Sequence, residues 1–163
     1  MKTGKPIIMI VDDERRFLDS MGKLLRKRGI NVITAEQGDR AVRMVRGYPV
    51  DVALVDLKMP GMSGLETLAS LREEKPELEV IIVSGQGSDE AKQACLDKGA
   101  FAFLDKPCTL DQILDAAAGV LRSRVMRKLN LDDRQVDSMI EAGPDTSRPE
   151  ILRRLKALEQ EAD

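Results

Sequence analysis

The chain has 163 residues, and its 26 Lys and Arg against 28 Asp and Glu give a formal net charge of −2. This length suits one domain with an appendage, which can bury a core without disulfide bonds. The near balance of charge excludes the basic excess of a typical nucleic-acid-binding surface. The absence of His excludes His-based metal sites and the Ser/His and Cys/His forms of catalysis.

The N-terminal residues, the short apolar runs and the cysteines are typical of a soluble protein in a reducing compartment. Residues 1–6 are polar and lack the apolar stretch of a signal peptide. The longest apolar runs are strand-sized, so no membrane span is predicted. Cys95 and Cys108 lack metal-like spacing and are typical of free thiols in a reducing compartment. We therefore expect a cytoplasmic protein with no membrane partner and no direct binding to nucleic acid.

Five short apolar runs alternate with longer amphipathic stretches. Consecutive apolar residues are typical of strands buried on both faces of a parallel sheet that helices cover. The runs are Ile7–Val11, Val32–Ile33, Val52–Val55, Val80–Val83 and Phe101–Leu104. From residue 6 to about residue 122 the chain therefore predicts five strand–helix units, and hence a doubly wound α/β fold with a parallel sheet.

The stretches between the runs have helical signals. The first has its apolar side chains on one predicted face, at Phe17, Met21, Leu24 and Leu25. Capping boxes mark the start of two later helices: Ser63 with Glu66, and Thr109 with Gln112. These signals place helices where the predicted fold requires them.

The last part of the chain, residues 123–163, has a different character. It holds eight basic and nine acidic residues and predicts one helix over about residues 132–142 and another that begins near Ser147. The second helix has an apolar stripe of Ile151, Leu155 and Leu158, which suits an oligomer seam, a partner-binding face or packing against the first domain. We expect a domain over residues 1–122 and a helical extension or linker over residues 123–163.

A group of basic residues lies near the junction of the two parts. These are Arg122, Arg124, Arg127 and Lys128. An anion-binding patch is one interpretation of this group. Favourable positive charge near the carboxyl end of a helix is the interpretation that we prefer.

Polar residues follow the apolar runs at the points where the predicted strands end. Asp12 and Asp13 follow the first run, Asp56 the third, Ser84 the fourth and Lys106 the fifth. The carboxyl ends of parallel strands meet at one edge, where open α/β sheets place their functional crevice. Two carboxylates ~5 Å apart at an effective dielectric of ~20 repel by roughly 3 kcal/mol, so this cluster calls for a cation. Mg²⁺ is the natural candidate because it binds a few carboxylates and keeps its waters.

With phosphate added, these residues have coherent roles. A carboxylate can act as the nucleophile and form an aspartyl phosphate. A metal ion and an ammonium group would then stabilise the phosphoryl oxygens. Taken singly, Asp12 and Asp13 could instead cap a helix and Asp56 could be a turn residue. Their convergence with Lys106 favours a functional site.

Four segments resemble motifs of one family. Residues 52–66 (VALVDLKMPGMSGLE) are similar to the phosphoacceptor segment of response-regulator receiver domains of two-component signalling, which include the chemotaxis regulators. Residues 8–14 resemble the first strand and acidic pair of that family, residues 83–85 its switch hydroxyl, and residues 99–107 its fifth strand and lysine. The resemblance covers about residues 6–122 and implies a flavodoxin-like sheet with strand order 2-1-3-4-5.

The resemblance also implies a role for each site residue. Asp56 would accept a phosphoryl group from a histidine kinase or a histidine phosphotransfer protein, and Ser84 and Lys106 would hold the phosphoryl oxygens. Mg²⁺ would be held by Asp12, Asp13, Asp56 and the backbone carbonyl of Lys58. Such a chain would not be an enzyme, apart from catalysing its own phosphorylation and dephosphorylation.

The resemblance further implies a switch. Ser84 and Phe103 would move together, although Phe103 could also be a static core residue. The partner-binding face would be that of the fourth helix, fifth strand and fifth helix, about residues 89–121. A downstream protein or a second copy of the chain would bind there. The family pattern also implies a cis Lys106–Pro107 bond, and places Lys58 and Gln86 beside the path of the phosphate.

Two alternatives remain open. The fold could serve as a docking or dimerisation module that does not use phosphate, although an unused acidic cluster would destabilise it. An aspartate-nucleophile phosphatase would usually carry a second acid two residues after the nucleophile, and this chain has Lys58 there. The chain could be a stand-alone regulator or part of a longer protein.

Overall fold

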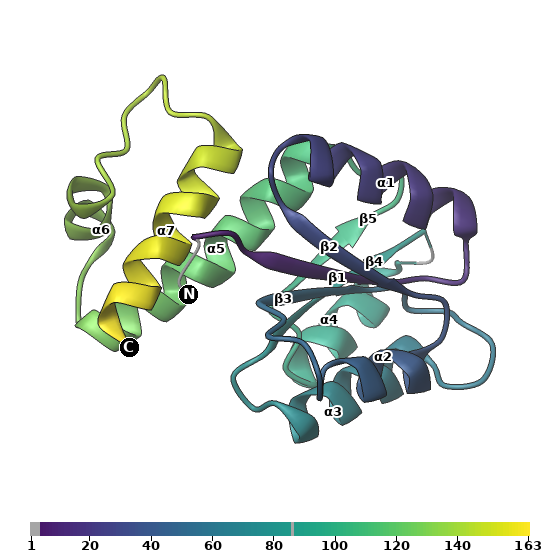
Figure 1. Cartoon of the computed structure of the whole chain (residues 1–163). Coiled ribbons are helices and arrows are strands. Elements are labelled where there is room, and N and C mark those ends of the chain that lie inside the picture. The colour runs from purple at the N-terminus through teal and green to yellow at the C-terminus, as the bar shows by residue number, and fades with distance from the viewer. Residues whose placement is uncertain (1–3, 86) are drawn as a thin grey trace.

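Five parallel strands form a single sheet in the order β2-β1-β3-β4-β5 in the computed structural model, which describes residues 4–85 and 87–163 (Figure 1). The strands are β1 (Ile7–Val11), β2 (Asn31–Ala35), β3 (Val52–Val55), β4 (Glu79–Ser84) and β5 (Ala102–Asp105). Every neighbouring pair is parallel. The predicted fold class and strand order are therefore confirmed.

Helices cover both faces of the sheet and continue beyond it (Figure 1). They are α1 (Arg15–Lys27), α2 (Gly38–Met44), α3 (Gly64–Glu74), α4 (Asp89–Asp97), α5 (Leu110–Leu129), α6 (Asp133–Met139) and α7 (Arg148–Ala162). Both predicted capping boxes are present, at the starts of α3 and α5. Within the described residues, no helix has both the length and the apolar character needed to span a membrane.

Alternate residues of β1 belong to two separate cores. Ile8 and Ile10 pack in the core that contains side chains of α1 and α5. Met9 and Val11 pack in the core that contains side chains of α2, α3 and α4. Successive side chains of a strand point to opposite faces, so a strand covered on both sides must be apolar at every position.

The predicted apolar face of α1 is correct except at one residue. Met21 and Leu25 are buried, and Phe17 is partly buried against the same core. The sequence pattern predicts Leu24 on this face, but its exposed fraction is 41%. Helical spacing alone does not separate Leu24 from Leu25, because it does not fix where the border of an apolar stripe falls.

The C-terminal extension folds back along α5. Helix α5 runs to Leu129, so position 122 lies inside a helix and not between two elements. Helices α5 and α7 lie side by side and parallel, because their ion pairs occur in the same order along both (Figure 1). These pairs are Asp115–Arg148, Arg124–Glu159 and Lys128–Asp163.

The apolar stripe of α7 packs inside the molecule. Leu155 and Leu158 are buried and Ile151 is partly buried, in the same core as Val120 and Val125 of α5. Of the three interpretations of this stripe, the structure shows packing against the preceding domain.

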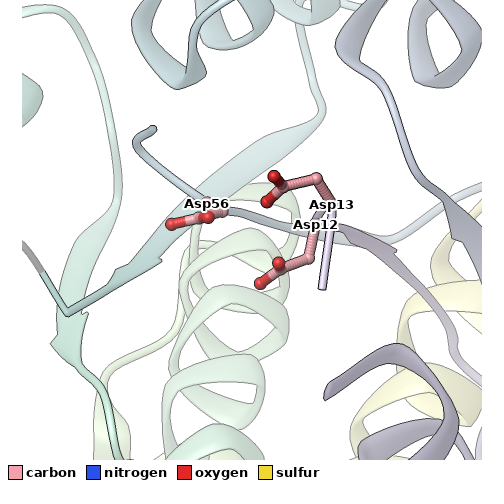
Figure 2. Close-up of side chains that lie close together, drawn as sticks. All are labelled: Asp12, Asp13 and Asp56. Atoms are coloured by element: carbon pink, nitrogen blue, oxygen red, sulfur yellow. The ribbon is translucent and has the colours of Figure 1, made fainter. Parts of the chain in front are cut away.

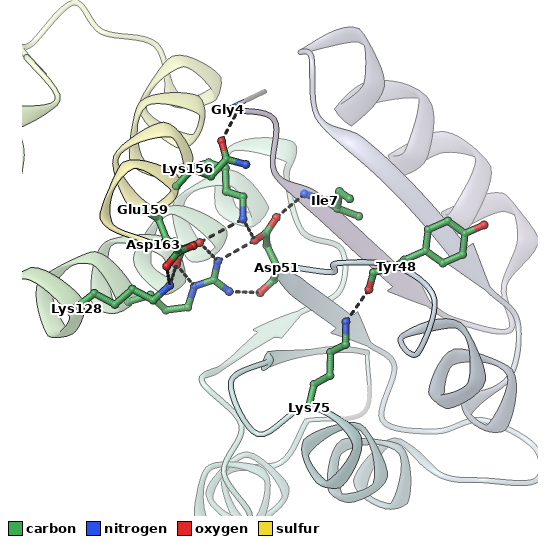
Figure 3. A network of polar contacts seen from close by, with 11 residues as sticks. Gly4, Ile7, Tyr48, Asp51, Lys75, Lys128, Lys156, Glu159 and Asp163 are labelled. Atoms are coloured by element: carbon green, nitrogen blue, oxygen red, sulfur yellow. Dashed lines mark hydrogen bonds and ion pairs between the residues drawn. The ribbon is translucent and has the colours of Figure 1, made fainter. Parts of the chain in front are cut away.

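A buried network of charged groups joins α7 to the base of the sheet (Figure 3). Asp51 precedes β3 and accepts hydrogen bonds from Arg124 Nη2 at 2.8 Å and Lys156 Nζ at 2.7 Å. Glu159 accepts from Arg124 Nε at 2.7 Å. The second oxygen of Asp51 accepts from the backbone N–H of Ile7 at 2.8 Å. Among the described residues, no buried side-chain nitrogen or oxygen lacks a hydrogen-bond partner.

The network corrects the interpretation of the basic group near residue 122. Arg124 is buried and paired with two acids, and Arg122 pairs with Asp133 and Asp137 of α6. Only Arg127 and Lys128 lie in the last turn of α5, where positive charge is favourable.

Candidate functional site

The predicted polar residues converge at the carboxyl edge of the sheet. Asp12 and Asp13 follow β1, Asp56 follows β3, Ser84 ends β4 and Lys106 follows β5. Carboxylate oxygens of Asp12, Asp13 and Asp56 lie within 4.8 Å of one another, and the three side chains form one group (Figure 2). Asp12 is 1% exposed and Asp56 is 8% exposed, so two of these acids are withdrawn from water.

A hollow of about 660 Å³ opens beside these acids. One side of it is polar and is lined by Asp13, Asp56, Lys58, Ser84 and Lys106. The other side is largely apolar and is lined by Phe17, Met21, Pro107 and Cys108. The Lys106–Pro107 peptide bond is cis, as the resemblance to receiver domains implied. Gln86, which the family pattern places beside the phosphate path, lies outside the described residues.

Three groups surround the ammonium of Lys106. Its Nζ donates to Asp12 Oδ2 and, at 3.2 Å, to Glu14 Oε1. It also lies 4.4 Å from the centroid of the Phe17 ring. Lys106 therefore offsets part of the negative charge of the acidic group.

The surroundings of Asp56 disfavour its charged form. Burial raises the pKa of Asp56, the nearby charge of Asp12 raises it further, and Lys106 and a hydrogen bond with Ser84 oppose the rise. Burial also raises the pKa of Asp12, against the hydrogen bond from Lys106. The charge of Asp12 thus adds to the effect of burial in disfavouring ionisation of Asp56.

This donor set fits a hard divalent cation. Two buried carboxylates and one exposed carboxylate present oxygens to a shared point, and oxygen ligands are the ones that Mg²⁺ prefers. A cation there would offset the charge of Asp12, which adds to the effect of burial on the pKa of Asp56. Asp12, Asp13 and Asp56 would be its ligands, and Lys58 lies beside them in the lining of the hollow.

The protein without a bound cation should become more stable when Asp56 is replaced by asparagine. The pKa of Asp56 is raised in the folded protein. Ionisation of Asp56 therefore lowers the free energy of unfolding once the pH exceeds the pKa that this carboxyl has in the unfolded chain. We expect Asp56→Asn to add roughly 1–3 kcal/mol to the free energy of unfolding at pH 7, the scale of the repulsion between carboxylates about 5 Å apart. The gain should vanish below about pH 4, where the unfolded chain also carries protonated acids.

Urea unfolding at pH 7 and pH 4, with a chelator present, would measure this difference. Adding Mg²⁺ at pH 7 should stabilise the wild type more than Asp56→Asn, because a ligand that binds only the folded state raises its stability. Equal stability of the two proteins at pH 7 would contradict the expected repulsion.

Phe103 lies next to the loop that follows Ser84. A Cβ built on Gly87 would lie 2.7 Å from a Phe103 ring carbon, so this loop touches the ring. On the side of α4, Lys92 Nζ lies 5.7 Å from the ring centroid and pairs with Asp105 at 2.8 Å. The ring is partly buried, between the site loop and α4.

Comparison with solved structures finds the same fold elsewhere. A CheY-like response regulator receiver domain protein from Methanospirillum hungatei JF-1 has a TM-score of 0.65 at 31% identity, over 68% of this chain and 89% of that chain. A response regulator receiver domain protein from Clostridium thermocellum has a TM-score of 0.69 at 29% identity, over 77% of this chain and 99% of that chain. The fold and the arrangement of the site are therefore those of the receiver-domain class.

Sequence comparison gives the family. The profile of the family described as response regulator receiver domain matches residues 8–118, and the chain belongs to this family. A cyclic di-GMP phosphodiesterase of Thermotoga maritima is 36% identical over 118 residues, which are 72% of this chain and 32% of that protein. A response regulator receiver protein of Anaeromyxobacter sp. (strain Fw109-5) is 33% identical over 82% of this chain and 56% of that protein. The chain thus spans between about a third and just over half of these two relatives.

Proposed function

We propose that this chain is a cytoplasmic phosphorylation switch of two-component signalling that accepts a phosphoryl group on Asp56. The receiver would be residues 1–122, and residues 123–163 a helical extension. The supporting observation is the place of Asp56: a nearly buried carboxylate facing a hollow, within reach of two other acids, a hydroxyl and an ammonium. The donor would be the phosphohistidine of a histidine kinase or a histidine phosphotransfer protein.

Each residue around Asp56 has a part in this transfer. A carboxylate oxygen of Asp56 would form a bond to phosphorus while the phosphorus–nitrogen bond of the donor breaks. Ser84 and Lys106, which line the same hollow, would donate hydrogen bonds to the phosphoryl oxygens. Asp12, Asp13, Asp56 and the carbonyl of Lys58 would hold Mg²⁺, which would supply positive charge to offset the negative charge of the phosphoryl group.

The signal would leave through the face of α4, β5 and α5. The loop after Ser84 touches Phe103, so a movement of Ser84 towards a phosphoryl group would disturb the packing of the ring. Leu96 of α4 and Phe101, which precedes β5, are exposed apolar residues of this part of the chain. A downstream protein or a second copy of the chain would bind there, and phosphorylation would shift a pre-existing equilibrium.

Enzymatic turnover of a substrate is not part of this proposal. Lys58 stands where an aspartate-nucleophile phosphatase would need a general acid. The relative named a phosphodiesterase matches this chain over only 32% of its own length, so its name gives no reason to assign that activity here. A docking module that does not use phosphate is the remaining alternative.

Incubation with acetyl phosphate tests the proposal. With Mg²⁺ we expect intact mass spectrometry to show the addition of one phosphoryl group, and with a chelator we expect none. Calorimetry should show Mg²⁺ binding to the unmodified protein. A protein that neither binds Mg²⁺ nor gains a phosphoryl group would be a docking module instead.

A further inference from the structure

We propose that Phe17 is a positioning residue that keeps the ammonium of Lys106 at the edge of the hollow. This inference rests on the proposed function, because it assigns the residue that prepares Lys106 to receive a phosphoryl oxygen. Nζ lies 4.4 Å from the ring centroid, within the range of a cation–π contact. The Lys106 side chain is only 14% exposed, so water screens this contact less than at an open surface.

Phe17 differs in kind from the two acids that hold the same ammonium. Asp12 and Glu14 are anions that compete with a phosphoryl group for Lys106. Asp12 is also among the residues that would bind a divalent cation, which would weaken its hold on Lys106. The Glu14 side chain is 64% exposed, and exposed ion pairs contribute little.

The attraction of the ring persists when these ion pairs break. An aromatic face attracts a cation through its quadrupole. Because the ring has no net charge, it does not repel an incoming phosphoryl group as a carboxylate would. It also limits the rotamers of the long lysine side chain, which lowers the entropy lost when Lys106 forms a new bond. Lys106 would therefore pass from Asp12 to the phosphoryl oxygen while staying over the same ring.

The fold packs the ring of Phe17 at the side of the hollow. Phe17 lies in the first turn of α1, and it packs against the core that α1 shares with α5. Its ring forms part of the apolar side of the hollow, together with Met21. Met21 has no aromatic face to offer Lys106, which makes it a matched control from the same helix and the same wall.

Three variants separate the effect of the ring quadrupole from the effect of apolar bulk. Phe17→Leu keeps an apolar side chain and removes the quadrupole, whereas Phe17→Tyr keeps both. We expect Phe17→Leu to slow labelling by acetyl phosphate about fivefold and to weaken binding of beryllofluoride, a phosphoryl mimic, by a similar factor. Phe17→Tyr and Met21→Leu should stay within about twofold of the wild type. The Mg²⁺ affinity by calorimetry should be unchanged in all three, because none of them alters a proposed ligand of the ion.

A double-mutant cycle tests whether Phe17 acts through Lys106. Beryllofluoride affinity in the presence of Mg²⁺, measured by ¹⁹F NMR, should not fall further when Phe17→Leu is added to Lys106→Met. An equal loss in both backgrounds, or wild-type affinity of Phe17→Leu, would overturn this inference alone. A wild type that neither labels nor binds beryllofluoride would overturn the proposed function, and this inference with it.

Discussion

Replacing Arg124 by methionine is expected to lower the free energy of unfolding by about 3 kcal/mol, the lower end of the range for breaking a buried ion pair. The substitution would leave Asp51 and Glu159 buried without their main partner. Lys156 would still contact both acids, which is why we expect the lower end. Chemical denaturation followed by circular dichroism would give the difference.

Arg127→Met is the matched control for this substitution. Arg127 lies about one turn further along α5, is exposed and donates a hydrogen bond to the backbone carbonyl of Ser123, so its loss should change stability by no more than about 0.5 kcal/mol. Limited proteolysis gives a second measurement, because a weakened network should expose α7 to cleavage before the sheet. Equal stability of the two variants would show that the network does not hold the extension in place.

Asp56→Asn is expected to reduce labelling by acetyl phosphate by on the order of 100-fold or more, because an amide is a far poorer nucleophile than a carboxylate. The side chain keeps its size, so the hollow should keep its shape. Asp12 and Asp13 remain nearby, but Asp12 is paired with Lys106, and both are proposed to hold the cation. Peptide mapping of the labelled wild type should place the phosphoryl group on Asp56.

Asp105→Asn provides the comparison for this result. Asp105 is an exposed acid at the same edge of the sheet, where it pairs with Lys92 and lies outside the acidic group. It should label within about twofold of the wild type, since exposed ion pairs contribute little. Normal labelling of Asp56→Asn would assign the acceptor to another residue and would contradict the proposed role of Asp56.

The parts of the molecule that the sequence predicted depend on local patterns. An uninterrupted run such as Ile7–Val11 indicates a strand covered on both faces, and the position after such a run indicates the edge of the sheet. These two rules are enough to bring Asp12, Asp56 and Lys106 together from the sequence alone. Capping boxes likewise depend on residues only three positions apart.

The parts that the sequence did not predict depend on distant residues. Arg124 meets Asp51 across 73 positions and Glu159 across 35, and no local pattern distinguishes it from Arg127. The contact between Phe17 and Lys106 joins α1 to the end of β5, and sequence patterns placed Phe17 only on an apolar helix face. The packing of α7 on α5 was one of three open interpretations, because an apolar stripe does not specify what covers it.

Helix α5 packs against two parts of the molecule. Its first half packs through Ile113 and Ala117 against the sheet, and its second half carries Arg124 and Val125 into the contact with α7. Its 20 residues form one uninterrupted rod about 30 Å long. A tilt of the rod by about 5° at the sheet would displace its far end by roughly 2–3 Å over that length. The buried network ties that end to Asp51 just before β3, so a tilt of this size would have to shift or break the contacts of Arg124 and Lys156 with Asp51.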